Sequence, residues 1–236
     1  MEHETVAAGE TSCLLEPTAG SCYGHGFHCM KKYFLELLIV IVIFLVFHIP
    51  LEGLSGFEEP RGFLEFYFGL ASAAYLFLFM WPLKYGVKYT FLRAVRENNP
   101  EPKHIFYAFT NFVNAVLASL ITKVIIAIGF IFLIVPGVYL ACKLAFVPYL
   151  VIEEKLDAVT AMKESWRMTE GHSIQIFMIY VLAILVSFAG LLLLGVGVIL
   201  SIMWIQLALA SMYYAVVSIE SQEKTITAAG ESSMNE

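Results

Sequence analysis

Long apolar stretches, separated by short polar segments, run along most of the chain. A transmembrane helix needs about 20 mostly apolar residues to cross a hydrocarbon core of about 30 Å. Stretches of about this length and composition occupy residues 33–49, 63–81, 113–135, 137–152, 174–194 and 196–217. The pattern therefore predicts an all-α fold, a polytopic transmembrane helical bundle of about six spans within residues 31–220.

Glycine and proline punctuate this pattern. Pro136-Gly137 lies between the third and fourth stretches, and Gly195-Val196-Gly197 lies between the fifth and sixth. These residues supply turn chemistry with almost no loop, so we expect two tight helical hairpins. An amphipathic segment precedes each hairpin. The two units form either a parallel repeat or two hairpins that resemble each other by composition alone.

The segment before the fifth stretch predicts an amphipathic helix over residues 158–169. Small and apolar residues share one of its faces and charged residues occupy the other. Asp157 suits the amino-terminal cap and Gly171 the carboxyl-terminal cap. We expect this helix to lie in the inner membrane interface or to pack as a cytoplasmic helix on the bundle. Its candidate interfacial residues are Ser165, Trp166, Arg167 and His172.

A second amphipathic segment precedes the third stretch. Ile105, Phe106, Phe109 and Phe112 form an apolar stripe there. Residues 100–135 are too many for one span perpendicular to the membrane. We therefore expect a break near residues 111–114.

The composition excludes an ordinary soluble domain. Hydrophobic residues make up 59% of the 236-residue chain and charged residues only 14%, against about 25% charged in soluble domains. The chain contains no nucleotide-binding loop, zincin motif or serine-hydrolase motif, and no basic cluster interleaved with stacking residues. We therefore predict a protein that is not an enzyme, uses no cofactor and binds no nucleic acid.

The distribution of lysine and arginine predicts the topology. If there are six spans, eleven of the fourteen basic residues fall on one side, and basic flanks are retained in the cytoplasm. Both termini should therefore be cytoplasmic in a multi-pass protein of the cell (inner or plasma) membrane. These eleven residues are Lys31, Lys32, Lys84, Lys88, Arg93, Arg96, Lys103, Lys155, Lys163, Arg167 and Lys224.

The two ends of the chain are polar and acidic. Their composition predicts disordered cytoplasmic tails over residues 1–30 and 221–236. The first tail contains Cys22, His25, His28 and Cys29, which are weak candidates for a zinc site because their spacing is not that of a standard finger. The alternative is an unstructured tail with reduced thiols.

One run of residues resembles a known family. It comprises residues 134–140 (Ile-Val-Pro-Gly-Val-Tyr-Leu), residues 146–154, Ala158, residues 161–166 (Ala-Met-Lys-Glu-Ser-Trp) and Gly171-His172. Over about residues 63–217 the chain resembles the YciC-like bacterial and archaeal membrane proteins, a group that includes the membrane domain fused in some relatives to a glycerophosphodiester phosphodiesterase. The resemblance implies a membrane fold and location. It implies no phosphodiesterase activity, because the chain has no room for that barrel of about 250 residues.

Polar residues within the predicted spans are candidates for function, because each buried charge costs about 2.5–3.5 kcal/mol in a bilayer. Lys123 lies near the middle of the third span, and Lys143 lies in the fourth span, where it could snorkel outward or meet Glu65. The alternative is that both lysines snorkel or pair structurally. The intramembrane candidates are Lys123, Lys143, Asn111, Asn114, Gln206 and Glu65.

Three functions fit these observations to different degrees. The leading hypothesis is a non-enzymatic integral membrane protein that acts through contacts with membrane lipids, a membrane-protein partner or its own copies. The alternative is a carrier or channel for a small solute or lipid, with Lys123 and Lys143 lining a polar cavity. A lipid-modifying enzyme ranks last, because Glu36, His48, Glu65 and His172 all lie near span ends.

Overall fold

The structure is a computed structural model that describes residues 15–55, 67, 69–71, 74–75, 79–192 and 196–234. Within these residues the fold is helical, with no strand. The helices discussed below are α1 (Ala19–Lys32), α2 (Phe34–Ser55), α4 (Trp81–Val95), η2 (Pro102–Asn111), α5 (Phe112–Phe132), α6 (Ile134–Lys143), α7 (Val147–Glu153), α8 (Ala158–Met168), α9 (Ser173–Leu192) and α10 (Val196–Met234).

Four segments of the described residues are long and apolar enough to cross a membrane. They are Pro102–Phe132, Ile134–Glu153, Ser173–Leu192 and Gly197–Thr227, and Phe34–Phe47 is a shorter apolar helix. The prediction of an all-α fold is therefore confirmed, and four of its segments have the length and composition of membrane-spanning helices. The count of six spans stays a prediction, because most of the predicted span 63–81 lies outside the described residues.

The two predicted hairpins are present as α5–α6 and α9–α10. In the first, the connection is Leu133 rather than Pro136-Gly137. Pro136 instead lies in the first turn of α6, where its missing N–H leaves no bond unmade. Gly137 packs so closely on α5 that a Cβ there would lie 2.6 Å from the ring of Phe130.

The span predicted over residues 137–152 lies within the apolar segment Ile134–Glu153, but the helix of this segment is interrupted. Helix α6 ends at Lys143, residues 144–146 form a turn, and α7 begins at Val147. Pro148 explains the break, because it has no N–H for the carbonyl of Leu144 and its ring would clash with that carbonyl in a continuous helix. The Leu144 carbonyl accepts from the N–H of Val147 instead.

The predicted disorder of the first tail is wrong from residue 19 onward, and residues 1–14 lie outside the described residues. Thr18 caps α1 by accepting a hydrogen bond from the N–H of Ser21. The Tyr23 hydroxyl donates to the Ile179 carbonyl at 3.0 Å, and the Trp204 indole N–H donates to the Tyr23 carbonyl at 2.9 Å. Helix α1 is therefore fixed against both α9 and α10.

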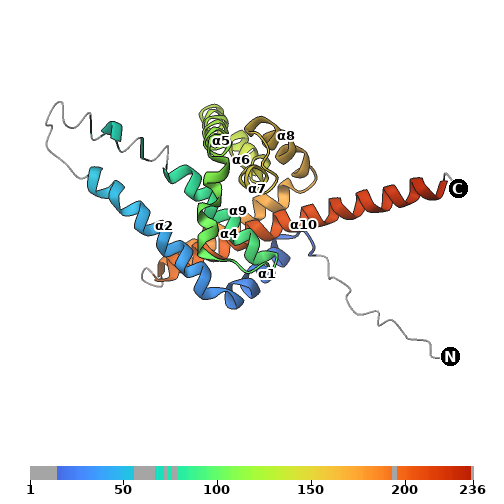
Figure 1. The fold of residues 1–236 in the computed structure, drawn as a ribbon, viewed down its shortest axis with the longest axis horizontal. Helices are drawn as coiled ribbons and strands as arrows, with labels where there is room; N and C mark the ends of the chain where they lie inside the picture. The colour runs from blue at the N-terminus through green and yellow to red at the C-terminus, as the bar shows by residue number, and fades with distance from the viewer. Residues whose placement is uncertain are drawn as a thin grey trace.

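The predicted disorder from residue 221 is wrong as well. Helix α10 continues without interruption to Met234. Figure 1 shows its last turns extending away from the body of the molecule toward the C-terminus. Ser221 and Thr225 turn their hydroxyls back onto the helix, where they donate to the carbonyls of Val217 and Ser221.

The four residues proposed as weak zinc ligands do not form a site. Cys22 is buried with its Sγ 3.8 Å from the Sδ of Met212, whereas His28 is exposed. The Nδ1 of His25 lies 3.2 Å from the Ser211 hydroxyl. Within the described residues, no group of three or more His, Cys, Asp or Glu side chains is arranged to hold a metal ion.

The burial of α1 makes a direct prediction for its thiols. Burial raises the pKa of Cys22 to about 12 and that of Cys29 to about 11. Since the thiolate is the reactive form, we expect both thiols to react with a maleimide at pH 8 at least about a hundredfold more slowly in the native protein than in urea. The rates are measured by mass spectrometry in a Cys13→Ser background. Equal rates in both conditions would contradict the packed helix.

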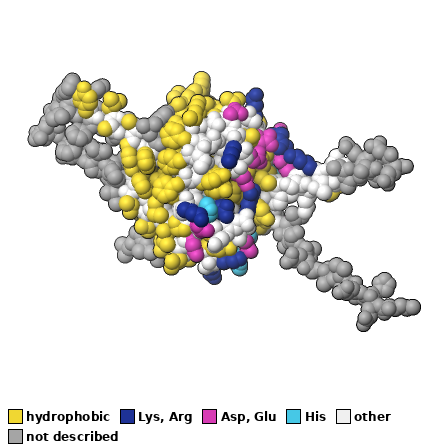
Figure 2. All heavy atoms as spheres, in the orientation of Figure 1, with side chains coloured by type: hydrophobic (Ala, Val, Ile, Leu, Met, Phe, Trp, Pro, Cys, Tyr) yellow, Lys and Arg dark blue, Asp and Glu magenta, His cyan; other side chains and the backbone are white. Residues whose placement is uncertain are grey.

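The core lies where α4, α7 and α10 meet. The rings of Tyr149 and Tyr213 stack at 5.0 Å, and Phe146 meets Tyr213 edge-on at 5.4 Å. Figure 2 shows hydrophobic side chains over much of the visible face, with charged side chains gathered on the part nearer the C-terminal helix. The molecule therefore has an apolar body with a localised charged surface.

Candidate functional site

Helix α8 begins at a strong cap. The Asp157 carboxylate accepts hydrogen bonds from the N–H groups of Val159 and Thr160, each at 3.2 Å. The bonds with Thr160 and Val159 hold the pKa of Asp157 below its ordinary value. Gly171, which follows the helix, has a φ of 80° that suits glycine. The predicted amphipathic helix and its amino-terminal cap are therefore confirmed, whereas the carboxyl-terminal cap is Thr169, two residues before the predicted Gly171.

The buried face of α8 is hydrogen-bonded to the turn between α6 and α7. The Ser165 hydroxyl donates to the Lys143 carbonyl at 2.8 Å and accepts from the Phe146 N–H at 3.3 Å. Both backbone groups lie at the break, where a continuous helix would have satisfied them. Ala161 and Ser165 are fully buried. In this Ala-x-x-x-Ser element, the serine hydroxyl thus bonds to the two backbone groups that the break leaves without helical partners.

Lys143 is buried beneath two aromatic rings. It is 4% exposed, and its Nζ lies 5.4 Å from the ring centroid of Trp166 and 5.7 Å from that of Tyr139. The two rings meet edge-on at 6.0 Å. Within the described residues no carboxylate lies within ion-pair distance of this ammonium, and the predicted partner Glu65 lies outside them.

The contacts of the Lys143 ammonium recover less free energy than its burial costs. Cation–π contacts contribute about 0.5–2 kcal/mol, whereas a lysine within a bilayer costs about 2.5–3.5 kcal/mol on insertion scales. The distances of 5.4 and 5.7 Å are near the outer limit of about 6 Å for such contacts. The site therefore favours an additional negative charge near the Lys143 ammonium.

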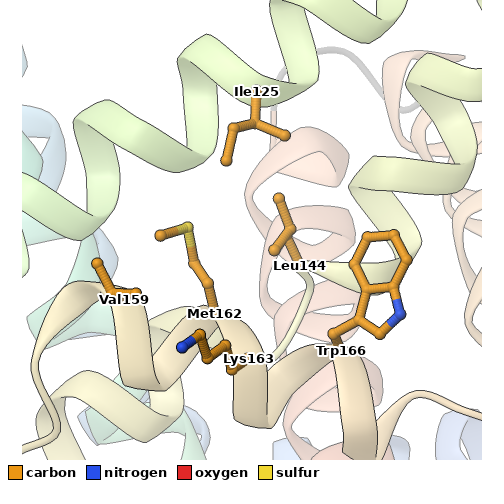
Figure 3. Close-up of a pocket in the computed structure, with 6 residues that line it drawn as sticks. All are labelled: Ile125, Leu144, Val159, Met162, Lys163 and Trp166. Atoms are coloured by element: carbon orange, nitrogen blue, oxygen red, sulfur yellow. The ribbon is translucent and has the colours of Figure 1, made fainter.

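A groove of about 350 Å³ lies between α5 and α8. Figure 3 shows Ile125 from α5, Leu144 from the turn and Met162 from α8 pointing into the same space. The remaining lining residues are Val159, Lys163 and Trp166. Five of these six side chains are apolar, so the groove accepts an apolar group and presents one charge at its edge.

A second groove, of about 520 Å³, lies between α6 and α9. Tyr139 lines this groove, whereas Trp166 lines the first one. The linings of the two grooves therefore touch at the edge-on contact of these two rings, and the Lys143 ammonium lies near both rings. The other lining residues are Ile134, Val135, Val138, Cys142, Ser173, Ile174 and Phe177.

The charged face of α8 contacts α10. The Arg167 guanidinium bonds to Glu164 on its own helix and to Glu220 on α10 at 3.0 Å. These carboxylates, Glu164 first, raise the pKa of Arg167 above its ordinary value. Beyond the end of α8, the Nδ1 of His172 lies 3.2 Å from the Glu170 carbonyl, so Arg167 contacts α10 whereas His172 contacts its own turn.

A family model, described as a domain of unknown function (DUF7847), matches residues 78–232, which is more than half of the chain. The chain belongs to the DUF7847 family. The matched segment of this DUF7847 protein contains both grooves and the Lys143–Trp166 contact. No curated protein and no solved structure matches the chain. The resemblance to YciC-like proteins stays a prediction.

The other predicted polar residues of the DUF7847 segment have separate environments. Asn114 donates to Asn111, which donates to the Val151 carbonyl, both at 3.0 Å. The Nζ of Lys123 lies 3.7 Å from the ring centroid of Trp81, and the Oε1 of Gln206 is buried with no hydrogen-bond partner in the described part of the chain. The structure therefore joins the two asparagines but gives the two lysines different aromatic partners.

A partly buried polar cluster was missed by the sequence reasoning. Arg96 and Glu153 form an ion pair between α4 and the end of α7. Nearby in the core, the hydroxyls of Tyr149 and Tyr213 are buried and have no partner among the described residues. Arg96 was interpreted as one of many topology-setting charges. Only the tertiary fold shows that it meets a carboxylate 57 positions away.

Proposed function

We propose that this DUF7847 protein is a non-enzymatic integral membrane protein that binds a membrane lipid in the groove between α5 and α8. The observation that carries the proposal is the apolar groove itself, which has Lys163 at its edge and the buried Lys143 beside it. An acyl chain supplies the apolar occupant, and a lipid headgroup places a charge next to the lysines. Four helical segments suited to a membrane place such lipids within reach.

The apolar lining alone gives the groove little affinity in a bilayer. Lipid tails are as apolar as the side chains that they would contact, so moving a chain from bilayer to groove gains little hydrophobic free energy. The preference for a bound lipid must therefore come from close packing and from the cationic edge. A lysine near a membrane surface contributes about 1 kcal/mol toward an anionic lipid.

Helix α8 supports this proposal because its two faces differ. Its inner face is hydrogen-bonded to the α6–α7 turn, while Trp166 is exposed on the side that lines the groove. Tryptophan prefers the headgroup region of a bilayer. We propose that α8 lies at the cytoplasmic interface of the cell membrane, with both chain termini on that same side.

The substitution Val159→Trp tests the groove. Val159 lines it and is 50% exposed, so an indole at this position can enter the groove without disturbing the core. We expect native mass spectrometry of the purified protein to show about fivefold lower occupancy by co-purified lipid, which corresponds to about 1 kcal/mol.

Ile184→Trp is the matched control. Ile184 is 57% exposed on α9 and lines neither groove. This variant should retain lipid as the unmodified chain does. If Val159→Trp retains equal amounts of lipid, the groove is not the binding site and the proposed function is wrong.

A further inference from the structure

We infer that the site binds one anionic phospholipid with two acyl chains, one chain in each groove and the phosphate against Lys143 and Lys163. The inference rests on the proposed function and adds the class of ligand. It follows from three features of the described residues: two apolar grooves whose linings touch, two lysines without carboxylate partners, and the Trp166 indole N–H, which has no acceptor there.

The two grooves are arranged for two chains that share one head. One groove is formed by α5 and α8 and the other by α6 and α9, and both are lined almost entirely by apolar side chains. The Tyr139 and Trp166 rings, one from each groove, touch at the junction. A ligand that fills both grooves must therefore branch at this junction, as a diacyl phospholipid does at its glycerol.

The charge beside the grooves selects the headgroup: Lys163 lines the α5–α8 groove, and Lys143 lies near the Tyr139 and Trp166 rings. The carboxylate nearest to Lys163 in sequence is Glu164, and it bonds to Arg167. Lys143 and Lys163 therefore both lack an ion-pair partner in the part of the chain that the structure describes. A phosphate is an acceptor of matching charge, and charge-assisted hydrogen bonds to it are the strong ones.

Trp166 supplies a third donor. Its indole N–H donates to no acceptor within the described residues, although Trp204 uses the same group to bond the Tyr23 carbonyl. Figure 3 shows the Trp166 nitrogen on the edge of the ring that faces away from Met162 and the apolar lining. The ring therefore offers a carbon surface to a chain and an N–H to a headgroup oxygen.

The headgroup part is tested with the full-length protein in lipid-free detergent, titrated with phosphatidylglycerol or phosphatidylcholine of identical chains and monitored by native mass spectrometry. We expect phosphatidylglycerol to bind about fivefold more tightly, and Lys143→Met to reduce this ratio below about twofold. Lys123→Met is the matched control, because Lys123 also lies over a tryptophan ring but away from both grooves. It should leave the ratio unchanged.

The two-chain part is tested with lysophosphatidylglycerol, which has one chain. Val138→Trp places an indole in the α6–α9 groove, since Val138 lines it. We expect this variant to bind the diacyl and lyso lipids equally, whereas the unmodified chain prefers the diacyl lipid. An unmodified chain that binds both headgroups equally, or both chain numbers equally, overturns this inference while lipid binding stands. Binding of no lipid at all overturns the proposed function itself.

Discussion

Gly86→Ala is expected to abolish the native fold or to lower its free energy of unfolding by at least about 3 kcal/mol. A Cβ at this position of α4 would lie 1.7 Å from the carbonyl oxygen of Ile105 and 2.6 Å from its carbonyl carbon. Both contacts are to backbone, so no side-chain rotation relieves them. Helix α4 and η2 would have to separate, which would expose Ile105, a residue with no exposed surface in the native fold.

The effect of Gly86→Ala is measured by the yield of monodisperse protein and by the midpoint of thermal unfolding. Gly20→Ala is the matched control. Gly20 lies in α1, and a Cβ there meets nothing within 4 Å, so this variant should be neutral or slightly stabilising because alanine favours the helix. A Gly86→Ala protein with a normal midpoint would show that α4 and η2 are not in this contact.

Arg96→Met is expected to lower the free energy of unfolding by about 2 kcal/mol. The Arg96 and Glu153 side chains are 26% and 19% exposed, so the loss is smaller than that of a fully buried pair. Removal of the guanidinium leaves the Glu153 carboxylate with no ion-pair partner, and its Oε2 already has no hydrogen bond within the described residues. The unpaired charge, more than the lost attraction, causes the destabilisation.

The double variant Arg96→Met, Glu153→Met separates these two causes. If the unpaired charge is responsible, the double variant recovers most of the lost stability in chemical unfolding. Lys103→Met is the control for an exposed pair, because Lys103 and Glu101 are 71% and 45% exposed and should contribute less than about 1 kcal/mol. A double variant that is less stable than Arg96→Met would refute this interpretation.

The elements that depend on local signals could be predicted from the sequence. Helix α8 follows from its two-faced pattern, from Asp157 at its start and from Gly171 after its end. The two hairpins follow from apolar stretches that meet at glycine and proline. The break before α5 also lies where it was expected, since η2 ends at Asn111 and α5 begins at Phe112.

The elements that depend on tertiary contacts could not be predicted. Helix α1 contains three glycines and no leucine, isoleucine or valine, so its isolated sequence favours disorder. Its stability comes instead from Tyr23, which bonds to Ile179 on α9 and accepts from Trp204 on α10. The break between α6 and α7 had a local signal, Pro148, which the apolar run around it obscured.

In the candidate site, too, single residues could be predicted from local signals, whereas their contacts could not. Lys143 was selected because a lysine within an apolar stretch is unusual, and Ser165 and Trp166 because they lie on an amphipathic helix. Their meeting could not be inferred, since the hydrogen bond from Ser165 to Lys143 joins residues 22 positions apart. The two grooves, formed by four helices, have no signature in the sequence.

The fluorescence of Trp166 tests lipid binding at this site most directly. Trp81 and Trp204 are replaced by Phe, and the protein is placed in phosphatidylcholine vesicles with increasing mole fractions of phosphatidylglycerol whose chains are brominated. Bromine quenches tryptophan only at close range, so a chain held in the groove quenches Trp166 saturably at a low mole fraction. We predict such saturation, and its loss on Val159→Phe, which fills the groove without adding a second tryptophan. Quenching that rises in proportion to the mole fraction, as random contact or binding without headgroup preference would give, contradicts selective binding of an anionic lipid at this site.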